Sequence, residues 1–96
     1  MQRDAIVIKG EDNVATALRD LARGEVAAVG IGEATASVTL RDAITFGHKF
    51  AVRDIARGEF ILKYGETIGR ATADIPAGAH AHVHNIESLR GRGDLQ

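Results

Sequence analysis

The residues best suited to chemistry in this chain are its histidines, because three of the four stand on alternate positions near the C-terminus. They are His80, His82 and His84, and the fourth, His48, stands alone. Residues two apart in a strand point to the same face, so a strand here would project the three imidazoles together. Neighbouring imidazoles would then start about 6.6 Å apart along the strand, near enough for two of them to reach one metal ion.

Imidazole serves as a metal ligand or as an acid or base near neutral pH, and the spacing leaves both uses open. All three could reach one metal only if the strand bent sharply, since the outer two would lie about 13 Å apart. The pattern therefore allows a pair of histidines completed by another ligand, such as His48, Glu66 or a partner chain. A simpler alternative is that one or two of them are ordinary surface or hydrogen-bonded residues.

Length and composition limit the domain that must hold these residues. The chain has 96 residues with three Phe, one Tyr and no Trp, so we expect one domain with a small aliphatic core. A net charge of −1 argues against partners such as nucleic acid or a membrane surface. The absence of cysteine excludes a disulfide scaffold. No run approaches about 18 apolar residues or resembles a signal peptide, and a cytoplasmic location is expected.

A repeated phrase predicts recurring turns. Residues 19–25, RDLARGE, return at 53–59 as RDIARGE, with a weaker echo, ADIPAGA, at 73–79. Each copy has an Asp that can hydrogen-bond the backbone ahead of it, an aliphatic residue, and a Gly that accepts positive φ. The unequal spacing of the copies does not suit a solenoid. We therefore expect compact turns in a small β-rich domain, each with its aliphatic side chain against the core.

Apolar runs between these turns predict short strands and one helix. The helix is expected from Asp12, as its N-cap, to Gly24, because apolar residues at 14, 17, 18 and 21 follow helical spacing. Strands are expected at residues 5–9, 25–29, 35–40, 48–53, 60–64, 67–71 and 79–84. The predicted fold class is mainly β with one short helix, arranged as a small barrel or clip over residues 1–85. Residues 86–96 are expected to be a C-terminal tail without a core of its own.

Ordered motifs in the second half of the chain carry a resemblance to a known family. They are Gly-His-Lys at 47–49, Lys-Tyr-Gly at 63–65, Ile-Gly at 68–69 and His-x-His-x-His-Asn at 80–85. Together they resemble the N-terminal domain of the altronate/galactarate dehydratase family, over about residues 5–85. The resemblance implies an SAF-type β-clip, the fold shared with sialic acid synthase and type III antifreeze proteins.

The resemblance also implies an activity and a partner. The family dehydrates sugar acids to 2-keto-3-deoxy acids and is associated with ferrous iron or manganese. We therefore expect the small subunit of a lyase, inactive alone, acting on a sugar acid with a separate large catalytic subunit. The alternative is that the chain is a fragment of an enzyme in which this domain is fused to the catalytic part. The large subunit would be the main holder of the Fe²⁺ or Mn²⁺, and the tail would contact it. Whether the chain also forms a homo-oligomer is left open.

By the same resemblance, the expected catalytic residues are His82, His84 and His48, at the mouth of the active site. His82 and His84 are the expected metal ligands, ahead of His80, although the sequence does not divide ligand from acid or base.

Four further residues are expected to bind substrate. Lys49 and Lys63 could hold a distal carboxylate as point charges. Tyr64 and Asn85 are weaker candidates for polar contacts.

Two alternatives remain. A small subunit like that of the sulfolactate sulfo-lyases would keep the same fold and partner but release sulfite instead of water. A stand-alone carbohydrate-binding SAF module would not be an enzyme at all. The scarcity of Trp and Tyr argues against such a module, because sugar faces commonly stack on these side chains.

Overall fold

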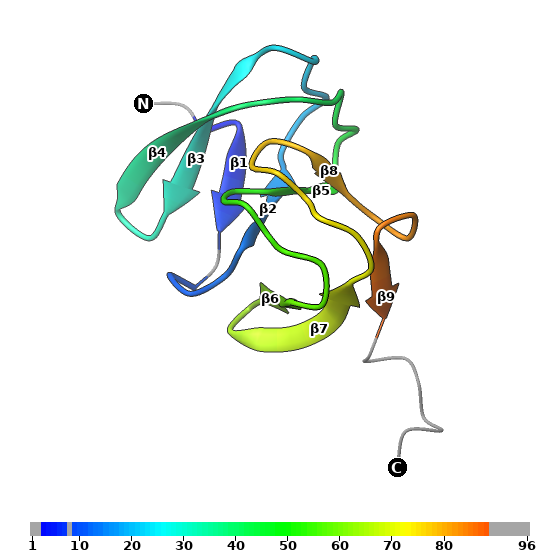
Figure 1. Ribbon diagram of the computed structural model, residues 1–96. Helices are drawn as coiled ribbons and strands as arrows, with labels where there is room; N and C mark the ends of the chain where they lie inside the picture. The colour runs from blue at the N-terminus through cyan, green and yellow to red at the C-terminus, as the bar shows by residue number, and fades with distance from the viewer. Residues whose placement is uncertain (1–2, 8, 89–96) are drawn as a thin grey trace.

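Two β-sheets make up the computed structural model, which describes residues 3–7 and 9–88 (Figure 1). The six-stranded sheet has the order β4-β3-β1-β2-β5-β8. Its strands are β1 (Ala5–Val7), β2 (Val14–Ala17), β3 (Val26–Ile31), β4 (Ala34–Thr39), β5 (Lys49–Ala51) and β8 (His80–Ala81). The three-stranded sheet has the order β6-β7-β9, and its strands are β6 (Phe60–Lys63), β7 (Glu66–Ala71) and β9 (Ile86–Ser88). The mainly-β prediction is confirmed.

The pairing of the strands is antiparallel except between β1 and β3, which run parallel. The chain must cross over to make this parallel pair, and residues 14–25 provide the connection through β2 and a turn. Figure 1 shows the β3–β4 hairpin at one end of the molecule and the β6–β7 hairpin at the other. Between them, β5 lies beside β2 on one side and β8 on the other.

The predicted helix is wrong, and the described residues contain no helix, so none is long and apolar enough to cross a membrane. Its first half is strand β2, which pairs with β1 on one side and β5 on the other. Val14 and Leu21 are buried, as a helix would have required, but Leu18 is 42% exposed. The β-branched Val14 and Thr16 suit a strand. The flanking strands form the backbone hydrogen bonds that a helix would have formed within the segment itself.

Asp12, predicted to cap that helix, instead holds the turn between β6 and β7. Its buried carboxylate accepts hydrogen bonds from the backbone N–H groups of Lys9, Tyr64 and Gly65 at 3.1, 2.9 and 2.8 Å. The buried side chain of Asn13 makes two further hydrogen bonds to the backbone of β6. These two adjacent residues therefore fasten the β1–β2 connection to the smaller sheet.

The repeated phrase forms the expected turns, and the structure shows a fourth copy around Ile44 and Gly47. All four central aliphatic residues are buried, and they bridge in pairs, Leu21 with Ile44 and Ile55 with Ile75. The glycines have φ between 84° and 90°, at positions 24, 47, 58 and 78. The fourth copy was not recognised from the sequence, because Ala43 stands where the others have Asp.

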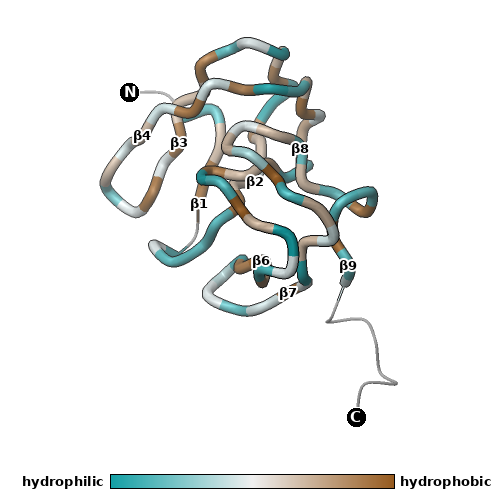
Figure 2. The backbone as a smooth tube through the Cα atoms, in the orientation of Figure 1, coloured by the Kyte–Doolittle hydropathy of each residue, from teal (hydrophilic) through white to brown (hydrophobic). Residues whose placement is uncertain are grey.

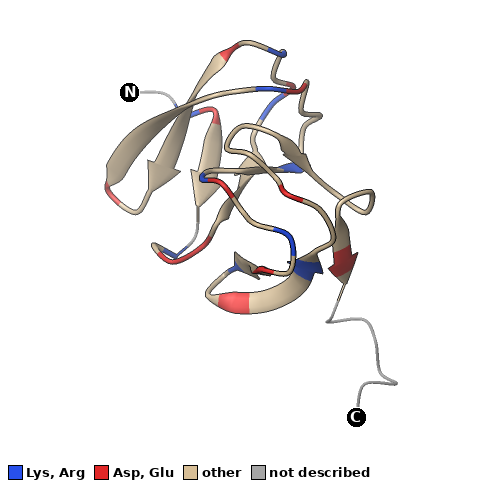
Figure 3. Ribbon diagram, viewed as in Figure 1, with Lys and Arg blue, Asp and Glu red and all other residues tan. Residues whose placement is uncertain are grey.

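Side chains from both sheets form two hydrophobic clusters that are mostly aliphatic, as predicted. One contains Leu40, Ile44 and the fully buried Phe50, whereas the other is built around Ile55 and Ile61. Figure 2 shows hydrophobic segments in the strands and hydrophilic ones mainly in the connections. Figure 3 shows β3 and β4 almost free of charge, with Lys, Arg, Asp and Glu concentrated in the connections and on β6, β7 and β9.

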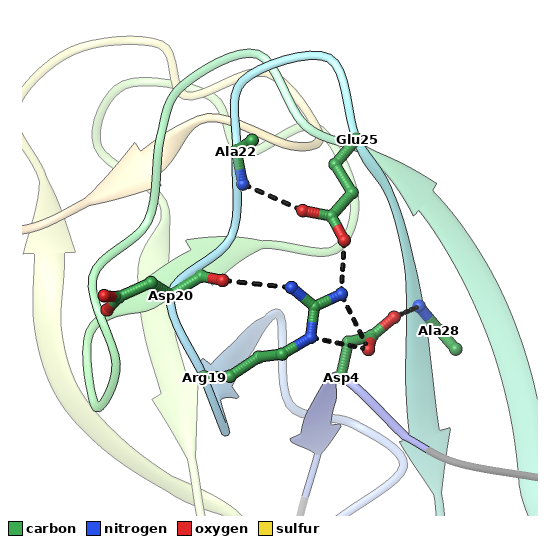
Figure 4. A network of polar contacts seen from close by, with 6 residues as sticks. All are labelled: Asp4, Arg19, Asp20, Ala22, Glu25 and Ala28. Carbon is green, nitrogen blue, oxygen red and sulfur yellow. Dashed lines mark hydrogen bonds and ion pairs between the residues drawn. The ribbon is translucent and has the colours of Figure 1, made fainter.

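A charged network ties β1 to the first turn and to β3 (Figure 4). Arg19 forms ion pairs with Asp4, at 3.0 Å, and with Glu25. The Asp4 carboxylate also accepts a hydrogen bond from the backbone N–H of Ala28 at 2.9 Å. That bond, followed by the contact with Arg19, lowers the pKa of Asp4 below its ordinary value.

The smaller sheet extends past the predicted end of the domain. Residues Ile86–Ser88, assigned by sequence to the tail, form β9 and pair antiparallel with β7. The rest of the predicted tail, residues 89–96, lies outside the described residues. Residues 86–88 therefore belong to the smaller sheet and not to a tail that begins after residue 85.

Candidate functional site

Three of the histidines converge where β5 meets β8: His48, His80 and His82. Nδ1 of His48 lies 3.0 Å from Nε2 of His80, and one ring nitrogen from each residue lies within 4.8 Å of the others. Their rings stack, with centroids 4.8 to 5.3 Å apart. Nitrogens bound to one metal at about 2.0–2.1 Å would be somewhat closer together.

Backbone pairing positions the first two histidines. His80 opens β8 opposite Phe50 of β5, and His48 follows directly on the positive-φ turn at Gly47. The carboxylate of Asp42 accepts a hydrogen bond from the backbone N–H of His80 at 2.9 Å. Asp42 begins the fourth turn, so the turn that sequence analysis overlooked helps to place the site.

Asn85 positions the third histidine. Its side chain is buried, accepts a hydrogen bond from the N–H of His82 at 2.9 Å and donates one to the carbonyl of His80 at 2.8 Å. The predicted strand 79–84 therefore ends at Ala81, and residues 82–85 form a turn. His84 is carried outward and is exposed. Its ring centroid remains 5.5 Å from that of His80, but it lies outside the three-histidine group.

Electrostatics favour the neutral form of His80. Partial burial lowers the pKa of His80, and the neighbouring His48, His82 and His84 lower it further, against a smaller opposing effect of Asp42. Neutral imidazole has a free lone pair, which is the form that coordinates a metal or accepts a proton.

A pocket of about 310 Å³ opens beside the cluster, and His82 forms part of its wall. The other polar residues of the lining are Lys49, Lys63, Tyr64 and Ser88, and the apolar ones are Ile68, Val83 and Ile86. Three of the four predicted substrate-binding residues thus line one pocket. The fourth, Asn85, does not, because both ends of its amide bind the backbone of the histidine turn.

The two lysines interact with their surroundings in different ways. Lys49 is half-buried, and its pKa is lowered first by burial and then by the charge of Lys63. Nζ of Lys63 donates to the hydroxyl of Tyr64 at 3.1 Å and lies 4.3 Å from the centre of its ring. Tyr64 has φ of 59°, a left-handed conformation held by the carboxylate of Asp12.

Sequence reasoning ranked the histidines differently from the structure. It favoured His82 and His84 as a ligand pair, whereas the structure groups His82 with His80 and His48. Glu66, considered as an outside ligand, lies on β7 and is not among the grouped donors of the described residues. Nothing in the sequence indicated that Ser88 would line the pocket, because its position there depends on the pairing of β9 with β7.

The described residues form an all-β fold, in agreement with the SAF-type β-clip that the sequence motifs imply. The family model for the altronate/galactarate dehydratase SAF domain matches residues 3–89, and the chain belongs to this family.

Several curated relatives place this domain within enzymes. The chain is 51% identical over 83 residues to altronate dehydratase of Escherichia coli, and 43% identical over 84 residues to that of Bacillus subtilis. Each alignment covers 86% of this chain but only 16% of the relative. The chain is also 45% identical over 56 residues to (2R)-sulfolactate sulfo-lyase subunit alpha of Chromohalobacter salexigens, covering 58% of this chain and 60% of that subunit.

Proposed function

We propose that this chain is the SAF component of a sugar-acid lyase, and that it supplies His48, His80 and His82 to an active site shared with a large catalytic subunit. The proposed reaction is elimination of water from a hydroxy acid. The observation that carries this proposal is the convergence of three imidazoles beside a pocket with two lysines, in a domain homologous to part of altronate dehydratase.

The donor set of the cluster fits a divalent transition metal. Within the described residues the group offers three imidazole nitrogens and no carboxylate. Imidazole suits iron, whereas manganese prefers oxygen ligands, so these residues favour Fe²⁺ over Mn²⁺ unless the large subunit adds carboxylates. When bound, such an ion would polarise the carboxylate and hydroxyl oxygens of the acid and stabilise negative charge formed on them.

Elimination also needs a base for the proton next to the carboxylate and an acid for the departing hydroxyl. His84 lies outside the three-nitrogen group but close to His80, so it is free for proton transfer at the mouth of the site. Lys49 and Lys63 can hold a distal anionic group of the substrate from the pocket wall. Asn85 acts through His80 and His82 and is a positioning residue.

The need for a second chain is inferred from the surroundings of the site. Val83, at the tip of the histidine turn, is 81% exposed, and Phe46, close in sequence to His48, is 64% exposed. A cluster flanked by exposed apolar side chains is suited to being covered by another protein surface. The relatives support this arrangement, because the altronate dehydratases are much longer and the sulfo-lyase homologue is named as a subunit.

A second candidate reaction is supported by the similarity to subunit alpha of the sulfolactate sulfo-lyase. The same site would then release sulfite in place of water. The leaving group differs, but the expected partner and histidine cluster do not.

The test is to express the tagged chain in its own host and identify any large chain that copurifies. The complex would be assayed anaerobically with Fe²⁺ on altronate, galactarate and sulfolactate, following keto acid and sulfite. Keto acid formed without sulfite, and lost in the His80→Ala variant, would establish the dehydratase. Sulfite release would favour the second candidate. A chain that stays alone and binds neutral sugars without metal would instead be a carbohydrate-binding module.

A further inference from the structure

The pocket beside the histidine cluster carries two positive charges without a carboxylate partner. Lys49 and Lys63 both line it, and every salt bridge found among the described residues involves other side chains. No Asp or Glu belongs to the lining within the described residues. Two ammonium groups facing one cavity repel each other, and an anion between them would remove that cost.

The remainder of the lining suits an anion as well. The hydroxyl of Tyr64 accepts a hydrogen bond from Lys63, which leaves its own proton free to donate to a ligand. Ser88 contributes a second hydroxyl, and the aliphatic side chains of Ile68 and Ile86 form an apolar part of the wall beside the charges. Charge-assisted hydrogen bonds are stronger in such an environment than in bulk water.

The pocket is large enough for one small molecule and lies directly beside the histidine cluster. A volume of about 310 Å³ suits one small molecule. His82 belongs both to the three-histidine group and to the pocket wall, so a single small acid can contact both.

We propose that this pocket binds a carboxylate, or a sulfonate of the same charge, at the end of the substrate remote from the histidines. The acid used by this chain therefore has two negatively charged ends, in preference to one charged end and one neutral hydroxymethyl end. This inference rests on the proposed function, which places the reacting end of the acid at the histidine centre.

Galactarate and galactonate are matched probes, because they differ only at carbon 6, where one has a carboxylate and the other a hydroxymethyl group. Binding of each to the full chain would be measured by ¹H–¹⁵N NMR titration, with and without Fe²⁺ under anaerobic conditions. Galactarate should bind about tenfold more tightly, the effect of one additional charge-assisted interaction. The amides of Lys49, Lys63 and Ser88 should shift in both conditions.

The variants Lys49→Met and Lys63→Met should reduce galactarate binding to the level of galactonate, and Lys63→Arg should retain the preference. Lys9→Met is the control, because Lys9 is exposed and does not line the pocket. Equal binding of the two acids by the unmodified chain, or no shift of the pocket amides at millimolar ligand, would overturn the assignment. If the chain failed to bind Fe²⁺ but kept the galactarate preference, the pocket assignment would stand and the proposed lyase centre would fall.

Discussion

Replacing Asn85 with Ala should weaken metal binding at the histidine cluster without removing any metal ligand. The side chain is 8% exposed and makes hydrogen bonds of 2.9 and 2.8 Å, to the N–H of His82 and the carbonyl of His80. Each such bond contributes about 1 kcal/mol, and its loss leaves a partly buried backbone group unpaired, so we expect about 2–3 kcal/mol of destabilisation centred on the turn. Because the turn places His82 against His80, metal affinity should fall by about 10- to 100-fold.

The assay is a competition titration with a chromogenic chelator, run beside thermal unfolding of the metal-free chain. Asn85→Asp keeps the acceptor for His82 but loses the donor to His80, so its affinity should be intermediate. His84→Ala is the control, since His84 is exposed and lies outside the three-nitrogen group. If Asn85→Ala bound metal as tightly as the unmodified chain, or if His84→Ala weakened binding equally, the positioning argument would be refuted.

Two further predictions concern stability. Gly78→Ala should destabilise the chain by more than about 3 kcal/mol, because the added Cβ would lie 2.1 Å from a backbone oxygen of β4 and φ is +88°. Gly24→Ala, with φ of +85° but nothing within 4 Å, should cost only about 1 kcal/mol, and similar losses in urea unfolding would contradict the packing argument. The second prediction follows from the lowered pKa of Asp4, whose carboxylate accepts from Ala28 and contacts Arg19. A carboxyl group whose pKa is lower in the folded state stabilises the fold above its unfolded pKa of about 4, and this contribution is lost as pH falls through the folded pKa. Asp4→Asn should therefore be less stable than the unmodified chain at pH 7, and the difference should close as the pH falls through the folded pKa of Asp4. A stability difference that is independent of pH would refute this.

The sequence predicted the parts of the fold that depend on short-range rules. The turns at Gly24, Gly58 and Gly78 were recognisable because Asp, an aliphatic residue and Gly recur at fixed offsets. The turn at Gly47 was not, because Ala43 replaces the Asp, and it becomes evident from the positive φ of Gly47 and the bridge from Leu21 to Ile44.

The predicted helix failed for a related reason. Apolar positions in β2 and the following turn happen to match helical spacing, while the partners that make β2 a strand come from β1 and from β5, more than 30 residues away. Non-local pairing of this kind leaves no periodic signal within the segment itself.

The candidate site was predicted in its residue types but not in its grouping. Because side chains alternate between the two faces of a strand, His80, His82 and His84 were predicted to share one face. That prediction requires the strand to continue to residue 84. Asn85 ends the strand through its side chain, and the antiparallel pairing of β5 with β8 then brings His48 into the place that alternation gave to His84.

The most direct test of the central claim is to measure which histidines bind metal. Anaerobic Fe²⁺ titration and X-ray absorption spectroscopy would be applied to the chain and to His48→Ala, His80→Ala, His82→Ala and His84→Ala variants. We predict a first shell containing three imidazole nitrogens, lost or severely weakened in the first three variants and retained in the fourth. Binding that survived the first three substitutions, or that failed only with His84→Ala, would contradict the assignment of the site.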